Sequence, residues 1–133
     1  MPPVPDFQGV LLDKAAQDAR AAEVMRDDVR FSDEIVGFHC QQAVEKAIKA
    51  VLETLRIEYP LNHDLVVLLN LLGEHAFACP VSLDEAKQLK PFAVRFRYDE
   101  LVQVDAPSPA FDRAQAVRTA TLTVAWAKGL VQP

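Results

Sequence analysis

Apolar residues recur at helical spacing along most of the chain, and short runs rich in proline, glycine and capping side chains separate the periodic segments. Residues 10–29 contain no glycine or proline and place charges between alanines, which predicts a first helix. Ser32 can then cap a second helix, because its hydroxyl can accept a hydrogen bond from the next turn. The apolar periodicity extends this second helix to about Arg56.

Further capping residues mark the helices that follow. Glu58-Tyr59-Pro60 ends the second helix, since the residue before a proline is disfavoured in helical geometry. Asn62 is expected to cap a third helix from His63 to Leu72 that is apolar on nearly every side. A helix of this kind is normally central in a bundle or covered by a second subunit. Residues 82–90 predict a short fourth helical segment, with a serine as its cap.

The segment 91–106 is ambiguous, because its alternation and aromatic content would also suit a strand. A single strand without a partner is not stable, so this segment is predicted to be an irregular or partly helical connector. Ser108 and Pro109 are expected to cap and begin a final helix, in which apolar residues return at helical spacing at Val117, Ala120, Val124, Ala127 and Val131.

These elements predict one domain, residues 1–133, with residues 1–8 as an N-terminal tail. The fold class is all-α, an antiparallel up-and-down bundle of four to five helices. A chain of 133 residues is long enough to bury one continuous core without disulfides or metal.

The second helix carries one polar residue inside its apolar face. At about 100° per residue, Gln41 falls between Ile48 and Leu52, and Glu45 lies at the edge of the same face. A buried amide must find hydrogen-bond partners. Gln41 is therefore expected to bond across helices, either to the start of the third helix or to a partner subunit, or else to contact a ligand.

Composition limits the possible functions. The formal net charge is −5 and the pI is about 5.1, which argues against a domain that wraps nucleic acid nonspecifically. The two cysteines are far apart and outside any metal-binding spacing, so no metal site, cofactor or disulfide is predicted and a reducing cytoplasm is expected. No apolar run approaches the roughly 18 residues of a membrane span.

Charged residues on the second helix, and the histidine that follows it at position 63, suggest two kinds of chemistry. Lys46 and Lys49 could hold a phosphate or nucleotide, although Glu45 and Lys49 also have the spacing of an ordinary ion pair on a helix surface. His63 could move protons if a carboxylate orients it. Its neighbour Asp64 is poorly placed for this, so Glu45 is the expected partner.

Three stretches together resemble the HEPN domain, named for higher eukaryote and prokaryote nucleotide-binding. They are residues 38–52, with a glutamine-alanine, glutamate-lysine and lysine pattern, residues 60–65, and the pair Arg97-Tyr98. Asn62 replaces the threonine usual in the family and keeps a capping side chain. Asp99 replaces the usual proline.

The resemblance also implies what an active member would contain. Many HEPN proteins are metal-independent ribonucleases with an arginine, four to six residues and then a histidine near the start of the last long helix, paired across a dimer. This chain has no histidine after His75. Arg56 and His63 have the required spacing, but they straddle a turn at Pro60. We therefore expect no ribonuclease activity of this type. A basic patch formed by Arg95, Arg97, Arg113 and Arg118 is a further candidate for binding anions.

The resemblance implies a non-catalytic module that binds a nucleotide or RNA, and a homodimer that pairs with a minimal nucleotidyltransferase in a toxin–antitoxin type system. The alternative is a divergent metal-independent endoribonuclease that uses His63 with Arg56 or Arg97. Candidate ligand-binding residues are Gln41, Glu45, Lys46, Lys49, His63, Arg97 and Tyr98.

Overall fold

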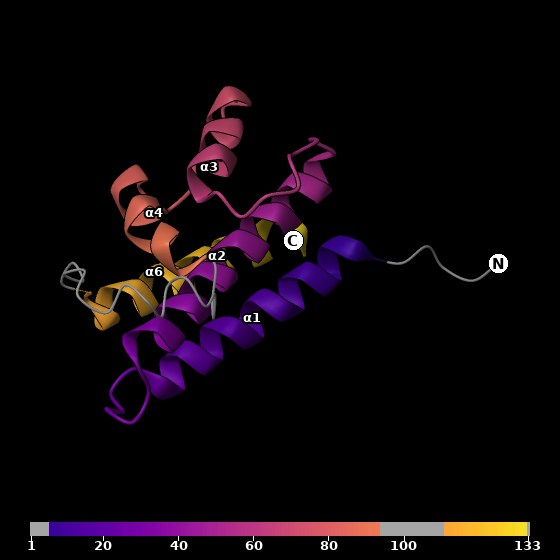
Figure 1. Ribbon diagram of the computed structural model, residues 1–133. Coiled ribbons are helices and arrows are strands. Elements are labelled where there is room, and N and C mark those ends of the chain that lie inside the picture. Colours follow the sequence, from indigo (N-terminus) through magenta and orange to yellow (C-terminus); the bar gives the residue numbers. More distant parts are fainter. Residues whose placement is uncertain (1–5, 94–110, 133) are drawn as a thin grey trace.

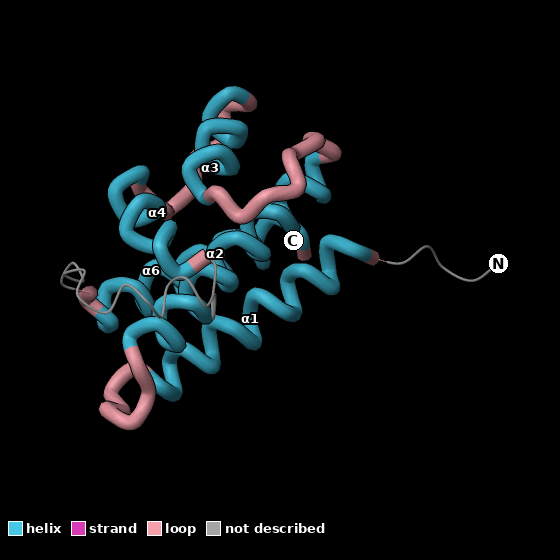
Figure 2. The backbone as a smooth tube through the Cα atoms, in the orientation of Figure 1, coloured by secondary structure: helices cyan, strands magenta, loops and turns pink. Residues whose placement is uncertain are grey.

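The computed structural model describes residues 6–93 and 111–132, and within these ranges the chain forms helices joined by loops, with no strand (Figures 1 and 2). The expected all-α helical bundle is confirmed. Its elements are α1 (Phe7–Met25), α2 (Asp33–Leu55), α3 (Leu65–Glu74), α4 (Leu83–Leu89), the 3-10 turn η1 (Lys90–Phe92) and α6 (Arg113–Val131).

Helices α1, α2 and α6 pack side by side, while α3 and α4 lie beyond α2 (Figure 1). α1 and α2 are antiparallel and joined by a short loop. The first residue of α6, Arg113, donates from Nε to Oδ1 of Asp33 at 2.7 Å, so α6 and α2 begin at the same end of the bundle. α6 therefore runs in the same direction as α2.

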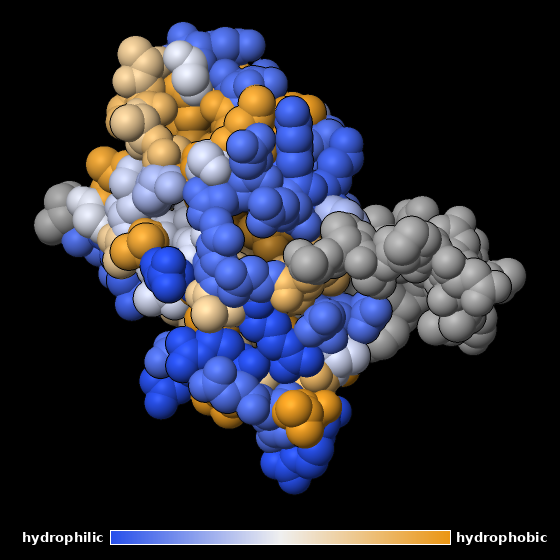
Figure 3. Space-filling view, turned by 90° about the vertical axis from the view of Figure 1, so that its left-hand side faces the viewer, coloured by the Kyte–Doolittle hydropathy of each residue, from blue (hydrophilic) through white to orange (hydrophobic). Residues whose placement is uncertain are grey.

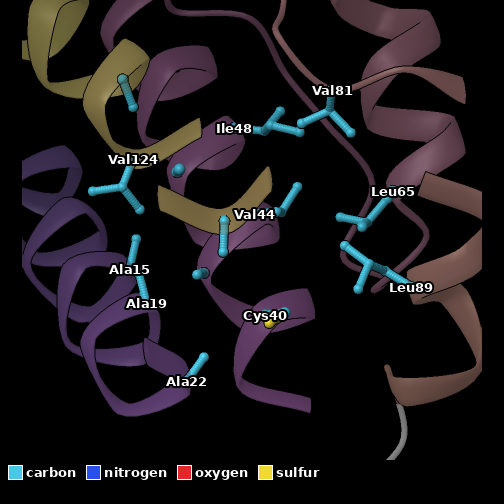
Figure 4. Close-up of a cluster of buried hydrophobic side chains, with 14 of the residues drawn as sticks. Ala15, Ala19, Ala22, Cys40, Val44, Ile48, Leu65, Val81, Leu89 and Val124 are labelled. Carbon is cyan, nitrogen blue, oxygen red and sulfur yellow. The ribbon is translucent and has the colours of Figure 1, made fainter. Parts of the chain in front are cut away.

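The central helix is α2, not α3. Leu65, Val81 and Leu89 cover one side of α2, while Ala15 and Val124 lie on the other (Figure 4). Of the two expectations for α3, a central position or cover by a second subunit, the first was wrong, because only Leu65, Leu68 and Leu72 of α3 are buried. α2 can be covered on several sides because its surface offers alanines and a glycine, at which neighbouring helices approach closely.

Gly37 shows how close this approach is. A Cβ atom built on Gly37 would lie 2.5 Å from the ring of Phe92 in η1. Phe92 in turn packs against Phe111 just before α6, with ring centroids 4.7 Å apart. This glycine therefore lets the segment after α4 pack on α2.

Both ends of α1 differ from the prediction. The helix begins at Phe7, inside the predicted tail, because the Asp6 carboxylate accepts a hydrogen bond from the Gly9 amide at 3.0 Å. It ends at Met25 instead of Val29. Asp28 accepts from the backbone amide of Arg30 at 2.9 Å and turns the chain, and acidic side chains are unfavourable at a helix C-terminus.

The predicted cap of α3 was also wrong, whereas Ser32 and Ser82 cap α2 and α4 as predicted. α3 begins at Leu65 and its cap is Asp64, which accepts from the Val66 amide at 3.0 Å. The Asn62 side chain instead accepts from the Asp64 amide at 3.2 Å and shapes the preceding turn. α6 begins at Arg113, after the cap Asp112, and the predicted start at 108–109 lies outside the described residues.

The apolar spacing predicted for the last helix is confirmed, since Val117, Ala120, Val124 and Ala127 are buried. Hydrophobic residues also reach the surface at the height of α3 in the space-filling view (Figure 3). Within the described ranges, no helix has the length and hydrophobicity needed to cross a bilayer.

Candidate functional site

Three polar residues of α2 line the side of the helix that faces the loop before α3. Gln41, Glu45 and Lys49 are each four residues apart, so they lie one above another on successive turns. His63, from the loop, meets them. Four of the residues singled out in the sequence are therefore brought together, and we call them the Glu45 cluster.

The Glu45 carboxylate is the centre of this cluster and its side chain is only 4% exposed. His63 Nδ1 lies 3.0 Å from each of its two oxygens. Gln41 donates to Oε1 at 2.9 Å, and the Lys49 ammonium donates to Oε2 at 3.1 Å. A buried carboxylate is tolerated only when such donors replace water, so these contacts allow Glu45 to lie in the core.

The amide of Gln41 is fully buried and its bonds explain why an apolar face carries it. Besides donating to Glu45, Nε2 donates to the carbonyl oxygen of His63 at 3.3 Å. Oε1 accepts from the side-chain Nε2 of Gln42 at 2.6 Å. The expected bond toward the start of the third helix is thus present. Gln41 positions the loop, and both N–H donors of its amide are used within the protein.

Lys49 is also largely enclosed, with a side chain that is 12% exposed. Its ammonium donates to the carbonyl oxygen of Asn62 at 3.1 Å and lies 5.7 Å from the centroid of the Tyr59 ring. Tyr59 donates its hydroxyl to Oε1 of Glu53 at 2.8 Å. Burial and this bond raise the pKa of Tyr59 above its usual range. The loop from Tyr59 to His63 is therefore held to α2 at several points.

His63 is the cluster member that faces solvent. Its side chain is 60% exposed although Nδ1 lies on Glu45. No described residue forms a hydrogen bond with Nε2. When the carboxylate holds the proton on Nδ1, the Nε2 lone pair is left as an exposed acceptor or base.

Lys46 lies on the other side of α2 and does not join the cluster. Its ammonium donates to Oδ2 of Asp18 on α1 at 2.7 Å, and the other oxygen of Asp18 lies 2.8 Å from His39 Nδ1. Lys46 thus ties α1 to α2. Two further candidates, Arg97 and Tyr98, lie outside the described residues, and Arg56 is an exposed residue at the end of α2.

Arg113 does not contribute to the candidate basic patch, because its guanidinium is bound within the fold. Besides Asp33, its guanidinium donates to the carbonyl oxygens of the α1–α2 loop, at Met25, Arg26, Asp28 and Phe31. A planar guanidinium suits this role because it offers several donors in one fixed geometry. Arg118 is exposed, while Arg95 lies outside the described residues.

The cysteines do not have the properties of reactive thiols. Burial raises the pKa of Cys40 to about 12 and that of Cys79 to about 11. The part of the chain that the structure describes contains no group of three or more histidine, cysteine or acidic residues able to hold a metal ion.

Comparison with protein families identifies the fold. The sequence-family model of the HEPN domain matches residues 9–125, which is most of the chain. The chain belongs to the HEPN domain family. The crystal structure of an archaeal HEPN homologue is similar, with a TM-score of 0.59 and 19% sequence identity over 94% of this chain and 98% of that chain. Comparison with curated proteins gave no match.

Membership in the HEPN family supports, in general terms, a module connected with nucleotides or RNA. Residues 38–52, the first of the three stretches that resemble the HEPN domain, contain three members of the Glu45 cluster. Sequence reasoning missed the role of Asp18, which joins His39 and Lys46. It also missed the carbonyl oxygen of Asn62 as a partner of Lys49, because backbone atoms carry no sequence signal.

Proposed function

We propose that this HEPN domain is a non-catalytic module that binds a nucleotide or RNA, with His63 as its exposed ligand contact. The proposal rests on the position of the His63 imidazole. Glu45 holds this ring in place, while more than half of the side chain faces solvent. A fixed, exposed imidazole can donate or accept a hydrogen bond to a phosphate or a base without first being ordered.

The rest of the cluster acts as support in this proposal. Gln41 and Glu45 are buried and set the position of the loop, while Lys49 supplies positive charge just beneath it. The Lys49 ammonium offsets the charge of the Glu45 carboxylate, which would otherwise repel an anion at His63. Arg97 and Tyr98 stay as proposed contacts from the sequence resemblance alone.

The absence of catalysis is supported by the last helix. The sequence has arginines there but no histidine after His75. The guanidinium of Arg113, at the start of that helix, is occupied by backbone carbonyls and Asp33, so it is not free to neutralise a phosphate. These observations favour binding over cleavage by the arginine–histidine pair usual in active family members.

Assembly belongs to the same proposal. We propose a homodimer in the cytoplasm that pairs with a minimal nucleotidyltransferase in a toxin–antitoxin type system, as the family resemblance implies. Light scattering should give about twice the chain mass of 14.8 kDa. A mass equal to one chain would contradict the dimer and leave ligand binding to be judged separately.

A second candidate is a divergent endoribonuclease that uses His63 with Arg56 or Arg97. The geometry that favours it is the Glu45–His63 contact, since a carboxylate that orients an imidazole is the usual arrangement of a general base. The 2′-hydroxyl of RNA would lose its proton to Nε2 in this case.

One pair of variants separates the two functions. Purified protein is screened by thermal shift against a panel of nucleotides and short RNAs, beside His63→Ala and the control His75→Ala, another exposed histidine. Binding requires a ligand-dependent rise in melting temperature that His63→Ala loses and His75→Ala keeps. Incubation with labelled RNA completes the test, because cleavage abolished only by His63→Ala would reverse our order of the two functions.

A further inference from the structure

A shallow groove of about 520 Å³ lies between the α2–α3 loop and the outer face of α3. It is formed by three consecutive loop residues and by four residues on successive turns of α3. We call it the acidic groove, and its lining residues are Glu58, Tyr59, Pro60, Val67, Asn70, Leu71 and Glu74. In Figure 1 the loop runs from the end of α2 to the start of α3.

The chemistry of the acidic groove does not suit a phosphate. Two carboxylates, Glu58 and Glu74, belong to its lining, whereas none of the lining residues is a lysine, arginine or histidine. Neither carboxylate forms an ion pair with any residue in the described ranges. On a chain with a formal net charge of −5, an anion would therefore meet repulsion here, and a cation attraction.

The groove also presents apolar surface and an unused amide. Val67 is 37% exposed on α3, and Leu71, Tyr59 and Pro60 add further apolar area. The Asn70 side chain makes no hydrogen bond to the described part of the chain. An occupant that matches this lining needs apolar side chains as well as positive charge.

The shape favours a segment of a protein over a small cation. The groove is open instead of enclosed, and apolar surface continues past it, since Leu61 next to Pro60 is 97% exposed. Small ligands are usually held in sites that cover most of their surface. A helix or extended segment can instead cover an open apolar groove and place basic residues along its rim.

We propose that the acidic groove docks a basic amphipathic segment of a protein partner. An apolar side chain of that segment packs on Val67 and Leu71, and lysine or arginine side chains pair with Glu58 and Glu74. The inference goes beyond the proposed function, because it does not depend on ligand binding at His63.

The loop side of the groove is fixed in advance. Tyr59 is held by its hydrogen bond to Glu53 and by the nearby Lys49 ammonium. The Ile57 amide donates to the carbonyl oxygen of Leu52 at 2.9 Å, which closes the C-terminus of α2 just before the groove. Docking therefore does not require the loop to become ordered first, which reduces the entropic cost of binding.

The test uses three short synthetic peptides and the full chain. The first peptide is amphipathic and built of leucine and lysine; the second replaces every lysine by glutamate, and the third replaces every leucine by serine. Affinity is measured by fluorescence anisotropy, and the binding surface by backbone amide shifts in NMR. The double variant Glu58→Lys/Glu74→Lys is compared with Asp13→Lys/Glu23→Lys, which makes the same charge change at exposed sites of α1.

The first peptide should bind and shift the amides of Val67, Asn70, Leu71 and Glu74. The groove variant should lose about tenfold or more in affinity, and the α1 variant only a few-fold through the change in net charge. Equal losses in the two variants would overturn the proposal, as would equal binding of the glutamate peptide or of the serine peptide. None of these outcomes decides whether a nucleotide binds near His63.

Discussion

His63 Nδ1 lies 3.0 Å from both carboxylate oxygens of Glu45, a residue 18 positions earlier on a different element. This contact joins the loop before α3 to the centre of α2. Because Gln41 and Lys49 donate to the same carboxylate and to loop carbonyls, one buried acid orders the whole α2–α3 connection.

Removal of this acid should therefore destabilise the fold. Glu45→Ala leaves the Lys49 ammonium and the Gln41 side-chain amide buried without the carboxylate that accepts their hydrogen bonds. This variant should lower the free energy of unfolding by about 3 kcal/mol. Glu34→Ala, at an exposed position in the first turn of the same helix, should cost less than about 1 kcal/mol. Urea denaturation of both variants checks the difference. Equal stability of the Glu45 variant and the wild type, with unchanged His63 ring resonances, would show that the contact is not formed.

Arg113 should prove structural instead of ligand-binding. Arg113→Lys keeps the charge but loses the several directed donors that hold the α1–α2 loop, so a loss of about 2 kcal/mol is expected. Arg118→Lys on the same helix is exposed and should change stability by less than about 0.5 kcal/mol. Thermal denaturation with circular dichroism compares the two. A silent Arg113→Lys would mean that these hydrogen bonds contribute nothing to stability.

Ala76 offers a stabilising substitution. It adopts a left-handed backbone with φ of 60° after α3, where the Phe77 amide donates to the carbonyl oxygen of Leu72 at 3.0 Å. Glycine is preferred at such a position, so Ala76→Gly should stabilise the domain by about 1 kcal/mol. The same change at the exposed helical residue Ala125 should destabilise it by about 1 kcal/mol. Melting temperatures that shift in the same direction would contradict this explanation.

The two thiols should react slowly in the folded protein. Burial raises the pKa of Cys79 to about 11 and that of Cys40 to about 12, so both stay protonated at neutral pH. The thiolate is the reactive form, and its fraction grows only as the pH rises toward these values. Ellman's reagent at neutral pH should therefore label the native chain slowly and both cysteines rapidly in denaturant. Rapid labelling of the native protein would show that a thiol is exposed and ionised.

Local patterns were sufficient to predict most of the helices. Ser32 and Ser82 stand directly before periodic segments and accept bonds from Ile35 and Glu85, as their positions implied. The local patterns failed to predict the helix start where several capping residues compete. Asn62 and Asp64 can both cap, and only the contacts of His63 with α2 decide which backbone conformation the loop takes.

The candidate site could be predicted only in part. Spacing placed Gln41, Glu45 and Lys49 on one face of α2, and the expected contact between Glu45 and His63 is present. Spacing could not reveal that Lys46 turns to Asp18 on α1, or that Arg113 binds the α1–α2 loop. These contacts join residues far apart in the chain, and a side chain's choice among distant partners leaves no periodic signal.

The sequence by itself determined an all-α domain, the approximate extent of its helices and a buried polar residue that would need partners, because these follow from side-chain periodicity and local hydrogen bonding. The tertiary structure alone decided that α2 is the central helix, that α6 runs parallel to it and that Lys46, Lys49 and Arg113 are already paired. Packing makes these choices, since burial and ion pairing depend on which surfaces meet and not on the order of residues within one helix.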